Sequence, residues 1–131
     1  MKKMTLFTAA LLVMALALAG CSGTTVGAFA SKYYNSEDYS AGVQEVQNYI
    51  STLEDCKATR IDYAGDSAVK AEADDRRLPP ERIMILTSTI ETGSKDPGDG
   101  LAPDKTYEGY QWVLTRNSSA ELWEIAEHGT P

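Results

Sequence analysis

The single histidine and one aspartate in an alternating segment are the residues whose chemistry could support proton transfer. His128 is the only histidine among the 131 residues, and Asp62 lies in the stretch from Ala58 to Tyr63. A general base at either position needs burial or a neighbouring charge to bring its pKa near the working pH. We expect neither, because Asp62 shares its strand face with Arg60, and because His128 follows the last expected strand, where fraying is common.

Clustered carboxylates occur in the Gly- and Pro-rich stretch from Lys95 to Gly100, and Asp104 follows shortly after. Calcium takes six to eight oxygen ligands, and the spacing of an EF-hand loop is absent here. One histidine and one buried cysteine cannot complete a tetrahedral zinc site. We therefore expect a turn-rich surface loop from Glu91 to Lys105, with no metal and no cofactor.

The chain has two cysteines, Cys21 and Cys56. Cys56 has Lys57 beside it, but the only histidine is far away in the sequence, whereas a reactive thiol needs a nearby histidine or cation. A lone cysteine in an exported domain usually packs as a small hydrophobic residue. We expect this structural role for Cys56 rather than a nucleophilic or redox one.

Aromatic residues recur on the last strands, and the chain could use them in two ways. Cross-strand aromatic pairs commonly form part of a hydrophobic core. The alternative is an exposed platform or pocket wall that binds a ligand. The candidate residues for such a ligand face are Tyr110, Trp112, Trp123 and His128, with Tyr107 nearby.

The charge balance limits the class of partner. The chain has 12 Lys and Arg against 19 Asp and Glu, a net charge of −7. The first 20 residues hold two lysines and no acid, so the remainder carries −9. A net-negative domain without a basic stripe repels phosphate, which disfavours nucleic acid as a partner.

The N-terminus has the form of a secretory signal: Lys2 and Lys3 precede an apolar run from Ala9 to Ala19 that is too short to span a bilayer. The sequence Leu18-Ala19-Gly20-Cys21 resembles the lipobox of bacterial lipoprotein signals. That resemblance implies cleavage between Gly20 and Cys21 and a diacylglyceryl group on Cys21, and such acyl chains hold a protein durably to a membrane. The expected organisation is a signal peptide at 1–20, a lipidated cysteine and flexible tether at 21–35, and one domain at 36–131.

The hydrophobic periodicity predicts an α+β domain. Apolar residues at helical spacing predict an amphipathic helix from Glu37 to Leu53, with Ser36 as its N-cap. A short helix is expected from Asp66 to Asp75, ended by Pro79 and Pro80. Strands are expected over 58–63, 82–90, 107–116 and 121–127. The long N-terminal helix should pack on one face of a curved antiparallel sheet of three to four strands.

Several short motifs resemble those of small secreted lipoproteins of Gram-positive bacteria that have no assigned function. The motifs are the run from Arg82 to Ser88, the Gly-Asp-Gly loop, the segment from Tyr110 to Arg116, and the ending from Trp123 to Gly129. The resemblance implies a cystatin-like fold, close to the nuclear-transport-factor-two-like cone. It also implies a host with one membrane, with the protein on the outer leaflet facing the exterior, and it allows a homodimer through the open sheet face.

These observations favour a membrane-anchored, non-enzymatic domain that binds an envelope protein or another partner. A second hypothesis is a small-ligand carrier or sensor that uses the concave aromatic sheet face. A third is an enzyme with Asp62 or His128 as a base inside the cone. No catalytic triad, phosphate loop or Cys-x-x-Cys motif accompanies these residues.

Overall fold

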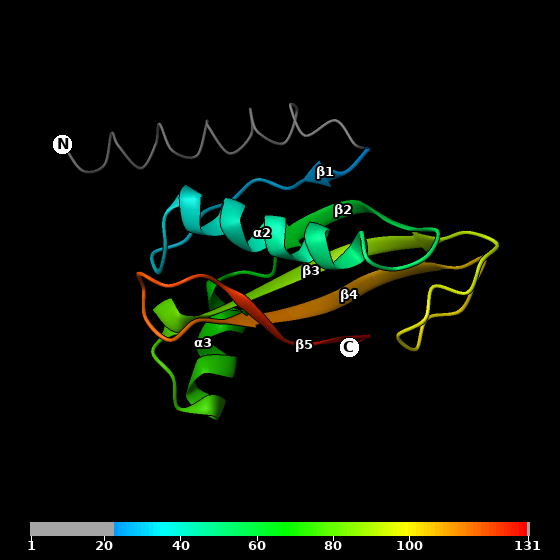
Figure 1. Ribbon diagram of the computed structural model, residues 1–131. Helices are drawn as coiled ribbons and strands as arrows, with labels where there is room; N and C mark the ends of the chain where they lie inside the picture. Colours follow the sequence, from blue (N-terminus) through cyan, green and yellow to red (C-terminus); the bar gives the residue numbers. More distant parts are fainter. Residues whose placement is uncertain (1–22, 131) are drawn as a thin grey trace.

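The computed structural model describes residues 23–130. The predicted signal peptide, the cleavage position at Gly20 and the lipidation site at Cys21 lie outside the described residues. The described part is a mixed α+β structure with one sheet and two α-helices (Figure 1). Its elements are β1 (Thr25–Val26), α2 (Ser36–Ile50), β2 (Cys56–Tyr63), α3 (Asp66–Arg76), the 3₁₀ turn η1 (Pro80–Arg82), β3 (Ile83–Thr92), β4 (Thr106–Thr115) and β5 (Glu124–Gly129).

The sheet has five strands in the order β1-β2-β3-β4-β5, rather than the three to four predicted. Strands β2 to β5 pair antiparallel as neighbours, whereas β1 pairs parallel to β2. The extra strand, β1, has two residues, which is too short to produce a periodic pattern in the sequence. Figure 1 shows α2 along one face of the sheet and α3 on the other side.

The segment predicted to be a flexible tether is packed on the domain over its described part, residues 23–35. Thr25 and Val26 pair with β2, and the N–H of Gly27 donates to the carbonyl of Ile61 at 2.8 Å. Phe29 stacks on Tyr39 of α2 with ring centroids 4.4 Å apart. The Gly, Ser and Thr content predicts a flexible tether, but burial of the aromatic residues that follow holds the segment in place.

Helix α2 begins where Asn35, rather than Ser36, caps it. The Asn35 side chain accepts from the Asp38 N–H at 2.8 Å, and the Asp38 carboxylate accepts from the Asn35 N–H, forming a capping box. The helix ends at Ile50, three residues before the predicted end, because the bonds that follow are of the tighter 3₁₀ type. Its buried side includes Tyr39, Val43, Val46 and Ile50.

Strand register decides which side chains lie beneath α2. Leu86 of β3 is opposite Trp112 of β4, and Trp112 is opposite His128 of β5, so the three share one sheet face. Strand β5 begins and ends later than predicted, so His128 belongs to the sheet instead of a frayed end. The other face is covered in part by α3, which contacts β3 and buries Val69 and Ala73.

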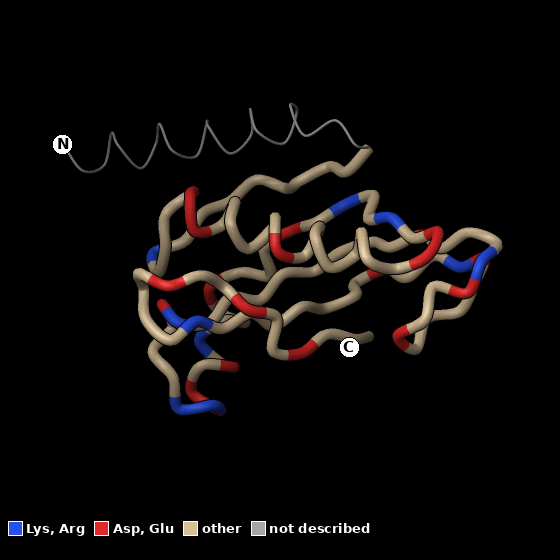
Figure 2. Tube along the Cα trace, viewed as in Figure 1, with Lys and Arg blue, Asp and Glu red and all other residues tan. Residues whose placement is uncertain are grey.

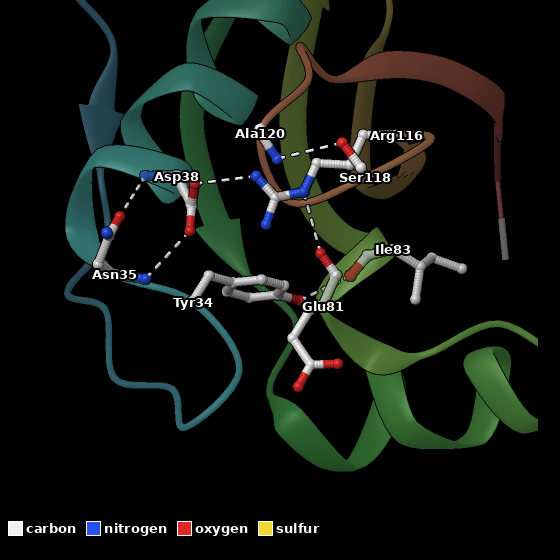
Figure 3. A network of polar contacts seen from close by, with 8 residues as sticks. All are labelled: Tyr34, Asn35, Asp38, Glu81, Ile83, Arg116, Ser118 and Ala120. Carbon is white, nitrogen blue, oxygen red and sulfur yellow. Dashed lines mark hydrogen bonds and ion pairs between the residues drawn. The ribbon is translucent and has the colours of Figure 1, made fainter.

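A buried arginine joins the start of α2 to the far end of β4 (Figure 3). The Arg116 side chain is 3% exposed, and its Nη1 lies 2.9 Å from Asp38 Oδ1. Its Nε donates to the Glu81 carbonyl at 3.0 Å, and its guanidinium lies 4.1 Å from the centroid of the Trp123 ring. Tyr34, beside this network, donates to the Ile83 carbonyl. These contacts fix the position of α2 over the sheet.

The helices in the described range, residues 23–130, do not meet the length and hydropathy that a membrane-spanning helix requires.

Candidate functional site

The only histidine lies in a chain of hydrogen bonds that joins α2, β4, β5 and the loop after β3. His128 Nδ1 is 2.7 Å from the Tyr110 hydroxyl, and its Nε2 is 3.2 Å from Asp99 Oδ2. The Tyr49 hydroxyl donates to the same Asp99 oxygen at 2.5 Å. We refer to Tyr49, Asp99, Tyr110 and His128 as the His128 cluster. The carboxylate favours a proton on Nε2, which leaves Nδ1 to accept from Tyr110.

The Gly-Asp-Gly turn brings Asp99 to this cluster. Asp99 has a φ of +56°, and Gly98 and Gly100 on either side have a φ of +81°. Three successive residues with positive φ reverse the chain, and glycine is the residue that adopts this conformation most readily. The Leu101 N–H donates to the Gly98 carbonyl at 3.1 Å and closes the turn. The loop therefore holds the Asp99 carboxylate against His128 at the end of the sheet, where the side chain remains 33% exposed.

The loop aspartates do not converge on a common point. Asp96 accepts from the N–H of Gly98 within its own turn, while Asp99 contacts His128. No group of three or more His, Cys, Asp or Glu side chains in the described part of the chain could hold a metal ion. The loop expected from Glu91 to Lys105 begins after Thr92, because Glu91 and Thr92 extend β3. One of its residues, Asp99, becomes part of the candidate site.

Hydrogen bonding and burial keep the two phenols of the cluster in their neutral form. The hydrogen bond to Asp99, helped by burial, raises the pKa of Tyr49 to about 12. Burial, with the negative charge of Asp99, also raises the pKa of Tyr110. A neutral phenol can donate, so Tyr49 and Tyr110 stabilise the carboxylate and the imidazole nitrogen that they contact.

An open groove of about 520 Å³ lies between α2 and β5, beside the cluster. Tyr49 and His128 form its aromatic wall, with their ring centroids 4.9 Å apart. Two carboxylates, Glu45 from α2 and Glu124 from β5, also line it. The remaining lining residues are Asn48, Thr52, Ile125 and Ala126. His128 also borders a smaller hollow of about 240 Å³ beside β4 and β5.

An imidazole oriented by a carboxylate is the usual arrangement of a histidine general base, but that base needs its second nitrogen free for the substrate. In this structure the second nitrogen bonds Tyr110, whose residue is only 4% exposed. The arrangement thus ties the loop, the helix and the last strand together. It leaves a groove with a polar and aromatic lining at the surface.

The other sequence candidates lie in different surroundings. Trp112 and Trp123 are 1% and 3% exposed, so they pack in the core together with Tyr110. His128 alone of the four ligand-face candidates lines the groove. Asp62 forms two hydrogen bonds with Arg60, at 2.7 and 2.9 Å.

Cys56 is half-buried at the start of β2. Burial raises the pKa of its thiol, so the unreactive protonated form is favoured. The sequence predicts a buried cysteine, and the structure places Cys56 only partly out of solvent. The thiol lies beside a separate hollow of about 440 Å³ between α2 and β2.

Two members of the site, Tyr49 and Asp99, were missed as partners of His128. The glycines that flank Asp99 indicate a tight turn, but they do not say where the turn points. Tyr49 lies off the apolar stripe of α2, and its contact with Trp112 across the helix–sheet boundary depends on how the helix is placed. No signal in the sequence links positions 49, 99 and 128.

Comparisons with family models, with curated proteins and with solved structures find no match to this chain.

Proposed function

We propose that this protein is a lipid-anchored extracytoplasmic binding domain that acts without catalysis and uses the groove between α2 and β5. The observation that carries the binding role is the His128 cluster beside that groove. Tyr110 and Asp99 contact both imidazole nitrogens, so neither nitrogen is free to act as a base. In this proposal, the role of His128 is to fix the groove wall in position.

The proposed anchor rests on the sequence before the described domain. The motif ending in Cys21 precedes β1 at Thr25 by four residues, a span of at most about 14 Å when extended. Because the following segment is packed on the sheet, a lipid on Cys21 would keep the domain next to the bilayer surface. In this proposal the protein lies on the outer leaflet of the cell membrane and meets its partner there.

We also propose that the domain has a cystatin-like fold. One longer helix, α2, on one face of an antiparallel meander supports a cystatin-like arrangement. A carrier that encloses a ligand against the aromatic sheet face lacks comparable support, since Tyr110 and Trp112 are packed beneath α2.

Membrane anchoring is tested by metabolic labelling with palmitate and by membrane fractionation of the natural chain and Cys21→Ser. We expect the label and the membrane association to be lost together in the variant. Equal membrane association of the two proteins would contradict the anchor.

The binding role is tested by photo-cross-linking on intact cells. A photoreactive residue replaces Asn48, which is exposed and lines the groove. The matched control carries it at Asn117, which is exposed in the β4–β5 connection. We expect a defined adduct, protein or small molecule, at position 48 and none at position 117. Identical background at both positions under several growth conditions would contradict binding through this groove.

A further inference from the structure

The charged groups that line the groove are all of one sign. Glu45 and Glu124 both line it, and neither has an ion-pair partner within residues 23–130. Another carboxylate of β5, Glu127, is paired, because it lies 2.7 Å from Arg76. Neither α2 nor β5 contains a lysine or arginine, as Figure 2 shows. The groove is therefore a region of negative potential with uncompensated charge.

The aromatic wall adds a second feature that favours a cation. The electron-rich face of a phenol ring attracts cations within about 6 Å of its centroid. Tyr49 lines the groove, and its hydroxyl is bonded to the Asp99 carboxylate, which orients the ring and places a third negative charge behind it. A small apolar surface from Ile125 and Ala126 completes the lining.

From this combination we propose that the groove between α2 and β5 binds an organic ammonium ion. The proposal deepens the binding function proposed above and rests on it. An ammonium group with alkyl substituents is weakly hydrated, so it can give up water to contact an aromatic face and an apolar floor while two carboxylates balance its charge. A volume of about 520 Å³ accommodates such a head group with part of the molecule that carries it.

The alkyl part of the ligand distinguishes this site from a metal site. A metal ion requires carboxylate oxygens that converge on one point, and the described residues contain no such group. In the groove, Glu45 and Glu124 come from separate elements and border the same space as the aromatic wall. This arrangement fits a bulky, diffuse positive charge.

The test compares choline with its neutral isostere, 3,3-dimethylbutan-1-ol, in NMR titrations of the folded domain at constant ionic strength. We expect saturable shifts of the amides of Tyr49, Thr52 and Ala126, with choline binding about tenfold more tightly than the alcohol. Glu45→Gln and Glu124→Gln should each weaken choline binding about threefold without affecting the alcohol. The matched control Glu108→Gln removes an exposed carboxylate outside the groove and should leave both affinities unchanged.

Tyr49→Leu removes the aromatic face and should weaken choline binding at least about fivefold. Because Tyr49 also bonds Asp99, a loss of loop structure could accompany this change. The two glutamine variants keep the test decisive, since both positions are at the surface. The amide spectrum of each variant shows whether its fold is retained.

Equal affinity for choline and the alcohol would overturn the proposal, as would shifts that map to another surface. An equal effect of Glu108→Gln and Glu45→Gln would also overturn it, because that result indicates unspecific screening. A defined adduct at position 48 on cells, combined with no preference for choline, would keep the binding function and reject the ammonium ligand. Absence of both would reject the two proposals together.

Discussion

Replacing the buried Arg116 with methionine should lower the free energy of unfolding of the domain strongly. Methionine keeps most of the length and the apolar packing of the side chain while removing its charge. The change eliminates the ion pair with Asp38, the hydrogen bond to the Glu81 carbonyl and the stacking of the guanidinium on Trp123. The fold and the α2–β4 contact depend on all three.

The expected loss in the free energy of unfolding is about 3 kcal/mol. A charge-assisted hydrogen bond contributes about 1.5–3 kcal/mol and a neutral one about 1 kcal/mol, and a desolvated cation–π contact adds up to about 2 kcal/mol. Relief of the cost of burying the guanidinium, which is 3% exposed, offsets part of this sum. Asp38 remains 25% exposed and keeps its bond to Asn35, so its charge stays partly hydrated after the substitution.

Urea unfolding followed by tryptophan fluorescence measures the loss, and a thermal midpoint lowered by roughly 10 °C should accompany it. A double-mutant cycle with Asp38→Asn should give a coupling energy of about 1–2 kcal/mol. Arg77→Met, at an exposed arginine, is the matched control and should change stability by less than about 0.5 kcal/mol. A loss below about 1 kcal/mol for Arg116→Met, or additive effects in the cycle, would show that this network does not hold α2 in place.

Three further outcomes follow from the packing and the electrostatics. Gly42→Ala should destabilise the domain by about 1 kcal/mol in urea unfolding, because overpacking outweighs the gain in helix propensity. A Cβ at this position would lie 2.6 Å from Sδ of the buried Met84. A stabilised variant would mean that the Met84 side chain moves freely. Asp99→Asn should lower the free energy of unfolding by about 1–2 kcal/mol and increase amide hydrogen exchange in the loop from 93 to 105. In a double variant with His128→Ala, the two losses of unfolding free energy should not be additive. Additive losses would contradict the His128 cluster. Five of the seven tyrosines have a raised pKa, that of Tyr49 reaching about 12, so their contribution to stability is complete below about pH 10, the unfolded value, and is lost as the pH rises toward 12. Absorbance of tyrosinate near 295 nm should therefore appear at higher pH in the folded protein than in urea, and coincident titrations would refute the burial of these phenols.

Local patterns were enough to locate most of the elements. The apolar stripe from Tyr39 to Leu53 predicts a helix, and the part of it up to Ile50 is the buried face of the helix at Ser36–Ile50. The run around Ile83 to Leu86 indicated a strand buried on both faces, and all four residues are buried in β3. These predictions succeed because periodicity reflects which face of an element leaves water.

Residues 23–35, which the sequence predicts to be part of a flexible tether, are packed on the domain. The small residues before Phe29 indicate flexibility when taken alone. They lie in a packed segment because Phe29 and Tyr34 find partners on α2, β2 and β3, which are distant in the sequence. A two-residue strand is then held by its neighbours and not by its own propensity.

The candidate site also combines features that local sequence predicts with features that depend on contacts between distant residues. The acidic balance, the single histidine, the turn at Gly98–Gly100 and the amphipathic helix could be predicted from residue type and near neighbours. Three features depend on the folded arrangement: the contact of Asp99 with His128, the place of Trp112 and Trp123 in the core, and the groove that Glu45 and Glu124 border. These facts depend on strand register and on the placement of α2 over the sheet, where a shift of one residue moves a side chain to the opposite face.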